Sequence, residues 1–175
     1  NTLGGGSVIE THASRHKRND PSTLNRLSTL ISGSSKEILL ASIERLGAVI
    51  PSTLAEQSNL SITETNYILG DLIKSGTVQP IPTSKGKTHL VMSTDQWNTI
   101  KHRIESELEK YHKLYPLRGG ISREEAKRLP NLPLRTSEAV IDKLLAEKAL
   151  SAKKHLISLP SHTVNYSKSE IVKID

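Results

Sequence analysis

Apolar residues recur at helical spacing through the first half of the chain, and breaker residues divide them into short segments. The spacing predicts a helix over about 21–31 and three more: about 35–46, a short one from Pro51 through Leu54 and Ala55, and about 62–75. Two of them begin with a Ser-x-x-Glu capping box, in which the serine side chain accepts an N–H that the first turn leaves unpaired. These boxes are Ser34 with Glu37 and Ser61 with Glu64.

The last of these helices leads into two short apolar runs. Four apolar residues are expected on its inner face: Tyr67, Ile68, Leu72 and Ile73. The runs 78–81 and 88–92 predict two strands, and Ser84-Lys85-Gly86-Lys87 predicts the turn between them. Three helices followed by a hairpin form the winged-helix arrangement of the helix-turn-helix class.

The same apolar pattern returns 72 residues further along the chain. At this offset the third helix and the strand after it align with later residues: Ile68, Leu69, Leu72, Ile73 and Val78 with Val140, Ile141, Leu144, Leu145 and Leu150. The remaining pairs are Leu60 with Leu132, Ile62 with Leu134, Val49 with Ile121, Leu39 with Tyr111 and Ile43 with Tyr115. Because the pattern repeats without a gap and the identities do not, we predict two copies of one fold.

A turn rich in breaker residues marks the second copy. Pro116 ends a long helix, and Gly119-Gly120 supplies the tight turn that follows. Ser122 and Glu125 form a third capping box and open a short helix. The predicted elements of this copy are helices over 96–115, 122–129 and about 136–147, and a hairpin of 150–153 with 155–159.

The predicted fold class is therefore mainly α with small β-hairpins (α+β), built as tandem winged-helix modules. The expected divisions are a leading segment at 1–20, a first module at 21–95, a second at 96–160, and a linker or the start of a third module at 161–175. The chain starts at Asn1 without a methionine, and we interpret it as a piece of a longer protein.

The composition excludes several classes of protein. The chain has 175 residues, no cysteine and no phenylalanine. Disulfides and thiolate metal sites are therefore excluded, and a core of Leu, Ile, Val and Ala suits small helical modules better than one large sandwich. No apolar run approaches the roughly 20 residues of a membrane span, so we expect no membrane partner.

No arrangement of residues predicts catalysis. Gly86-Lys87-Thr88 resembles the end of a P-loop, but Ile81 stands where the motif needs glycine, and no buried strand leads into it. His12 and His16 lie four residues apart without a second ligand pair nearby, so we expect no metal site. We predict a non-enzymatic binding or structural module that holds no cofactor in this stretch.

The charge is concentrated in the second copy. The net charge is +6, and residues 96–160 hold thirteen basic and eight acidic side chains. A basic face attracts polyanions, although a solvated lysine-rich surface has the same composition. The candidate phosphate contacts lie at the second turn, the short helix and the two wings: Arg118, Arg123, Lys127, Arg128, Arg135, Lys153, Lys154, Lys85 and Lys87. The third helix of the first copy instead carries Glu64 and Asp71, which repel phosphates.

Three stretches resemble the bacterial selenocysteine-specific translation elongation factors (SelB), and the resemblance follows the whole chain in order. Thr2-Leu3-Gly4-Gly5-Gly6, followed by Arg15-His16-Lys17-Arg18, is similar to the segment that closes the third barrel domain of that family. His112 to Arg118, with Gly119-Gly120 after it, resembles the His-x-x-(His/Tyr)-Pro-Leu-Arg-x-Gly segment of the second of four winged-helix modules. Leu159-Pro160-Ser161-His162 is the third match.

The resemblance implies a GTPase, similar to elongation factor Tu, that delivers selenocysteinyl-tRNA to the ribosome at a UGA codon while its C-terminal winged helices hold a hairpin in the messenger RNA. Residues 1–20 would close the barrel domain, and the GTP- and Mg-binding domains and the hairpin-reading module would lie outside this chain. The chain itself would space and orient the RNA-binding tip relative to the GTPase body, as a cytoplasmic monomer. Direct RNA or ribosome contact by the second module would be secondary.

Two other functions stay open at this point. A tandem winged-helix DNA-binding transcription regulator is favoured if the third helix of the second copy reads bases. The outward candidates on that helix are Arg135, Glu138, Asp142 and Lys143, of which two are acidic. A purely structural spacer is the remaining hypothesis.

Overall fold

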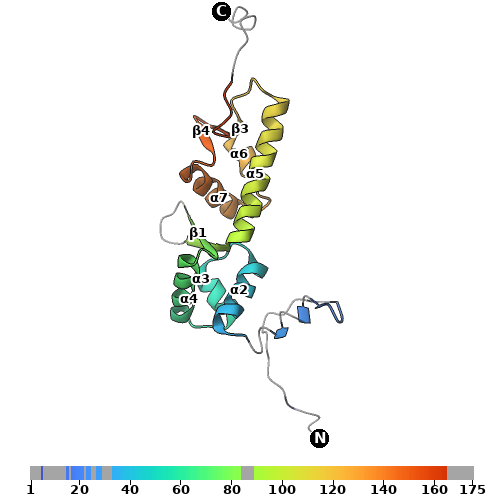
Figure 1. Ribbon diagram of the computed structural model, residues 1–175, viewed down its shortest axis with the longest axis vertical. Coiled ribbons are helices and arrows are strands. Elements are labelled where there is room, and N and C mark those ends of the chain that lie inside the picture. Colours follow the sequence, from blue (N-terminus) through green and yellow to red (C-terminus); the bar gives the residue numbers. More distant parts are fainter. Residues whose placement is uncertain are drawn as a thin grey trace, which may run out of the picture. The chain divides into compact units, whose positions relative to one another are not determined.

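The computed structural model (Figure 1) describes residues 5, 15, 17–21, 23, 24, 27, 28, 33–83 and 89–164. The chain divides into two compact units, Asn1–Pro80 with Val91–Ser93, and Ile81–Leu90 with Thr94–Asp175. The module boundaries expected at residues 20, 95 and 160 stay predictions. The predicted wing turn at 84–87 lies outside the described residues.

Three helices form the body of the first unit: α2 (Ser35–Leu46), α3 (Pro51–Ser58) and α4 (Ile62–Lys74). The predicted capping box of Ser34 and Glu37 is confirmed in both directions, and the Ser61 hydroxyl accepts the Glu64 N–H at 3.1 Å. The core consists of buried aliphatic residues from all three helices and the wing: Leu39, Ile43, Val49, Leu54, Leu69, Leu72, Val78 and Val91. Burying each such side chain contributes about 1.5–3 kcal/mol.

The wing of the first unit is a hairpin of β1 (Val78–Pro82) and β2 (His89–Ser93), and both strands lie close to the predicted runs. Val49, between α2 and α3, exchanges two backbone hydrogen bonds with Val91, at 3.0 and 2.8 Å. This single bridge ties the turn between the first two helices to the wing.

One residue of α4 does not face the core as expected. Tyr67 is 73% exposed, whereas Thr65, Leu69 and Leu72 are buried. A periodicity based on apolar residues alone misses a buried threonine, so the predicted inner face was rotated by part of a turn.

The helices α5, α6 and α7 of the second unit lie beside short strands (Figure 1). The elements of this unit are α5 (Thr94–Leu114), β3 (Ile121–Ser122), α6 (Arg123–Ala126), α7 (Leu134–Ala146), β4 (Ser151–Lys153) and β5 (Leu156–Ser158). The strands form an antiparallel sheet in the order β3-β5-β4. The predicted fold class, mainly helical with small antiparallel sheets, is confirmed. α6 is shorter than predicted, and α7 begins two residues earlier, directly after Pro133, whose fixed φ suits a helix entry.

The unbroken 72-residue register is wrong for the first helix of each copy. Leu39 and Ile43 are fully buried, but Tyr115 is 40% exposed. The core positions of the second unit belong to Leu108 and His112, which lie 69 residues after Leu39 and Ile43. The core register therefore shifts by three residues between the first helix and the rest of the second unit, and the segment between its first two helices is longer, at 115–122 against 47–50 in the first unit.

Candidate nucleic-acid interface

A close backbone approach fixes the turn that follows α5. Gly120 has a φ of +146°, and a Cβ there would collide with the carbonyl oxygen of Ile157. Ile121 then pairs with Ile157, so the turn is joined to the sheet as β3. Glycine is required here by space and by backbone conformation together.

The capping box after this turn is confirmed. The Ser122 N–H donates to Glu125 Oε2 at 2.9 Å, and the Glu125 N–H donates to Ser122 Oγ at 3.2 Å. The hydrogen bond from the Ser122 backbone lowers the pKa of Glu125. The Glu125 carboxylate is therefore committed to starting α6.

Arg118 lies on the exposed turn against two tyrosines, Tyr111 of α5 and Tyr115 directly after that helix. Its guanidinium is 4.6 Å from the Tyr115 ring centroid, and its Nη1 donates to the Tyr111 hydroxyl at 3.4 Å. That hydrogen bond raises the already high pKa of Arg118. Stacking on an aromatic ring holds the guanidinium at the surface while its remaining donors stay accessible.

Two of the predicted phosphate contacts form ion pairs inside the unit. Arg123 forms an ion pair with Asp142 of α7. Lys127 lies 2.9 Å from Glu124 and 3.3 Å from Glu138, with its side chain only 13% exposed. The hydrogen bond to Glu124 raises the pKa of Lys127. These cations neutralise the carboxylates of α6 and α7 and join the two helices.

Four other predicted contacts are exposed and form no ion pair within the described part of the chain: Arg128, Arg135, Lys153 and Lys154. The hydrogen bond from Lys127 lowers the pKa of Glu124, to which the charge of Arg128 adds a smaller effect. The structure thus gathers Arg118, Arg123, Lys127 and Arg128 around α6. Lys153 ends β4 and Lys154 begins the β4–β5 turn, whereas Lys85 and Lys87 lie outside the described residues.

Sequence reasoning missed a buried histidine at the end of α5. His112 is 8% exposed and continues the buried stripe of that helix: Trp97, Ile100, Ile104, Leu108 and His112. Its ring stacks on His162 with centroids 3.7 Å apart. The helical spacing of the stripe was a usable signal, but histidine is seldom counted as a core residue.

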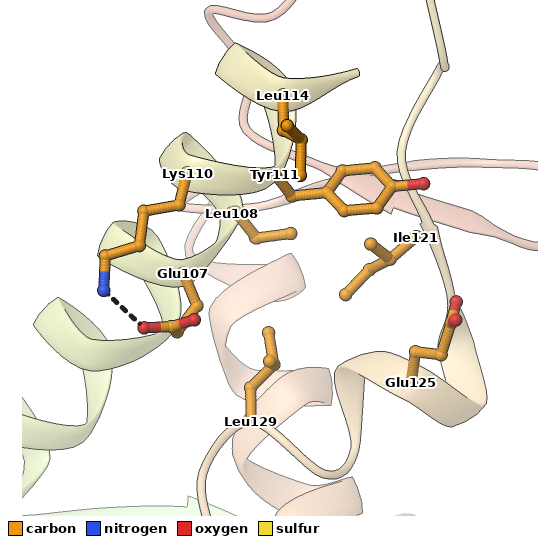
Figure 2. A pocket seen from close by; sticks show the side chains of 8 residues that line it. All are labelled: Glu107, Leu108, Lys110, Tyr111, Leu114, Ile121, Glu125 and Leu129. Atoms are coloured by element: carbon orange, nitrogen blue, oxygen red, sulfur yellow. Dashed lines mark hydrogen bonds and ion pairs between the residues drawn. The ribbon is translucent and has the colours of Figure 1, made fainter.

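A groove lies between α5, β3 and the segment formed by α6 and the residues after it, as Figure 2 shows. Its volume is about 320 Å³, and its apolar lining comes from Leu108, Tyr111, Leu114, Ile121 and Leu129. Glu125 borders one side, and Lys110 and Glu107, paired at 2.7 Å, border the other. Leu114 at its edge is 69% exposed. The groove has room for an apolar side chain, and its rim carries both signs of charge.

The helix α4 of the first unit, which corresponds to α7 in the repeat, offers a different surface. The exposed side of α4 carries Thr63, Glu64, Asn66, Tyr67, Asp71 and Lys74. Glu64 also accepts a hydrogen bond from the Ser35 hydroxyl at 2.8 Å. Two carboxylates against one lysine disfavour phosphate contact at this helix.

The described residues hold no group of three or more His, Cys, Asp or Glu side chains placed to bind a metal ion. A search of the same residues found no helix with the length and apolar content needed to cross a membrane.

Comparison with known proteins gives one family match. Residues 106–159 match the family model described as elongation factor SelB, winged helix. The match spans less than half of the chain. It contains the turn around Arg118, the helices α6 and α7, and the hairpin of β4 and β5. It supports a winged-helix domain of SelB type in the second unit.

Among solved structures, the chain is similar to a MarR family transcriptional regulator from Silicibacter pomeroyi DSS. The identity is 20%, the alignment covers 73% of this chain and 80% of that chain, and the TM-score is 0.33. A likeness at this level carries no argument about function. No curated protein matches the chain.

Proposed function

We propose that this chain is the proximal part of the RNA-tethering arm of a selenocysteine-specific elongation factor. In this role it spaces and orients an RNA-binding tip relative to a GTPase body. The observation that carries the proposal is the family match over residues 106–159, which coincides with the turn, α6 and α7. The same stretch holds all the predicted phosphate contacts except Lys85 and Lys87.

The internal contacts of the second unit suit a rigid element of an arm. The Arg118 turn is held by its approach to Ile157, by β3–β5 pairing and by the capping box. The Arg123–Asp142 and Lys127–Glu138 pairs join α6 to α7. An arm can transmit orientation only if each module keeps one conformation. These contacts restrain the Arg118 turn and the position of α6 against α7.

The exposed cations suit a secondary role in phosphate binding. The exposed cations lie on turns and at the ends of a helix and a strand, from which long side chains reach a sugar–phosphate backbone: Arg128, Arg135, Lys153 and Lys154. The two acidic residues that α7 could present to bases, Glu138 and Asp142, already bind Lys127 and Arg123. We therefore expect weak, salt-sensitive RNA or ribosome contact without reading of base sequence.

The larger role rests on the resemblance and extends the proposal beyond this chain. The whole factor would bind GTP and Mg in other domains, and its partners would be selenocysteinyl-tRNA, the ribosome and the selenocysteine-insertion hairpin of the messenger RNA. We place it in the cytoplasm, where translation occurs, and expect the chain to be a monomer. We assign no catalytic role to the residues of this chain.

A titration separates this function from its rivals. The 175-residue chain is titrated against the selenocysteine-insertion hairpin, the same hairpin with a shuffled loop, duplex DNA and ribosomal subunits, each at two salt concentrations. The proposal predicts weak binding to both hairpins with equal affinity, lost at the higher salt. Tight sequence-specific binding to duplex DNA would overturn it in favour of a transcription regulator. A folded chain that binds none of the targets would leave a purely structural spacer.

A further inference from the structure

Two stacked histidines join three parts of the second unit. His112 ends the buried stripe of α5, and His162 follows β5, with an interplanar angle of 12° between their rings. The Leu159 N–H donates to His112 Nε2 at 3.2 Å. His162 Nε2 donates to the carbonyl oxygen of Arg118 at 2.8 Å. The pair thus connects α5, the Arg118 turn and the segment that leaves the sheet.

These contacts determine the protonation state of His112. Its Nε2 must lack a proton, because it accepts the Leu159 N–H. In the neutral ring the proton is then on Nδ1, which is buried and has no hydrogen-bond partner among the described residues. Burial, followed by the charge of His162, lowers the pKa of His112. His162 behaves differently, because its bond to the Arg118 carbonyl needs only a donor and survives protonation.

The groups around the pair do not offset a charge on His112. From α5, the Tyr111 ring faces His112 edge-on with centroids 6.0 Å apart, and the Tyr111 hydroxyl accepts from Arg118. From the turn, the only charged side chain in this cluster of contacts is Arg118 itself, which is a cation. Ser158 of β5 and Leu159 directly after it bring no charge. A proton on His112 therefore finds repulsion and no carboxylate partner in this set of contacts.

We propose that His112 and His162 form a proton-sensitive latch, which holds the 159–162 segment against α5 and the Arg118 turn at neutral pH and releases it when His112 is protonated. The latch is a property of the second unit alone and goes beyond the arm function. One consequence of the latch rests on the proposed function: in an arm, release of the 159–162 segment would change the direction in which the chain leaves the second unit.

The sign of the effect follows from linkage. His112 has a folded pKa below the ordinary histidine value of about 6.5, so the unfolded chain binds more protons in that range. The stabilisation from the neutral latch is fully present above about pH 6.5 and is lost as the pH falls from there toward the folded pKa of His112. The lost interaction is the Leu159 hydrogen bond, since a protonated Nε2 cannot accept it.

Solution NMR on the whole chain tests the latch directly. The ring signals of His112 and the amide signal of Leu159 are followed from about pH 7.5 to about pH 5, the range in which histidine titrates. We expect one shared midpoint, below about 6.5. Hydrogen-exchange protection of the Leu159 amide, corrected for the intrinsic exchange rate, should fall roughly fivefold to tenfold, the loss expected for one hydrogen bond.

Three variants make the test specific. His112→Gln keeps an acceptor for the Leu159 N–H but cannot titrate, so the pH dependence of the Leu159 amide should vanish. His162→Phe keeps an aromatic ring but carries no charge, so the His112 midpoint should rise. His155→Gln changes an exposed histidine of the wing turn and should leave the Leu159 titration unaltered.

Two results would overturn the latch. One is a His112 midpoint at or above about 6.5 in the unaltered chain. The other is a Leu159 titration that persists in His112→Gln. Either result would leave the RNA-arm function standing, because the NMR experiment involves no RNA, and a failed RNA titration would likewise leave the latch standing.

Discussion

The two units share one core pattern but differ in the segment between their first two helices. In the first unit this segment spans residues 47–50 and makes a single bridge, Val49 to Val91. In the second unit it spans 115–122 and contains the Arg118 turn, the close approach at Gly120 and strand β3. The added length builds a third strand and a surface that the first unit lacks.

The difference extends to how each unit uses its charges. In the first unit the carboxylates of α4 face outward beside an exposed tyrosine. In the second unit the carboxylates of α7 bind cations of α6, and further cations remain exposed on the turns. A repeated core therefore specifies the fold in both units, while the joining segments and the partners of charged residues decide what each surface can bind.

The largest expected effect tests whether the two cores are equivalent. Leu72 and Leu144 occupy the same position of the repeat, and both are fully buried. We expect Leu72→Ala and Leu144→Ala each to lower the free energy of unfolding of its unit by about 2–5 kcal/mol. Chemical denaturation measures this loss, and Leu114→Ala, at an exposed position, is the control with little effect. A large loss in one unit alone would break the equivalence.

The glycines give the next largest contrast. Gly120→Ala should destabilise the second unit by about 2–4 kcal/mol, because the new Cβ meets the Ile157 carbonyl at a strained φ. Gly70→Ala, in open space on α4, should instead stabilise the first unit by about 0.4–1 kcal/mol. Thermal unfolding of both variants checks the signs. Equal effects of the two substitutions would show that the close approach is not required.

The smallest expected effect concerns the two reciprocal capping boxes. Ser34→Ala and Ser122→Ala should each cost about 1 kcal/mol, since each removes one acceptor from a helix start. Denaturation with urea resolves a loss of this size. A much larger loss at Ser122 would show that this box also supports the Arg118 turn, and would sharpen the difference between the units.

The sequence predicted those parts of the fold that depend on local pattern. The capping boxes at Ser34 and Ser122, the wing strands and the third helices all follow from residues close together in the chain. The exposed Tyr67 and the shifted register of α5 were missed because burial depends on which face meets another element. Strand β3 was missed because two residues carry no periodic signal.

The candidate site was predicted less completely than the fold. Composition located the basic stretch, but only tertiary contacts show that Arg123 and Lys127 have carboxylate partners on α7 and α6. The partners of Arg123 and Lys127 on α7 lie 19 and 11 residues away along the chain. No spacing rule within one helix identifies such pairs, so a count of basic residues overestimates the charge that remains available to RNA.

The measurement that tests the central claim compares RNA binding by two matched variants. One replaces Arg128, Arg135, Lys153 and Lys154 of the second unit by Gln, and the other replaces Lys17, Arg18, Lys36 and Lys74 of the first unit by Gln. The account predicts that only the second-unit variant loses affinity for the hairpin, with the slope of log K against log salt reduced by about 0.7–0.9 for each phosphate that is no longer neutralised. Equal losses in the two variants, or unchanged binding by the second-unit variant, would contradict it.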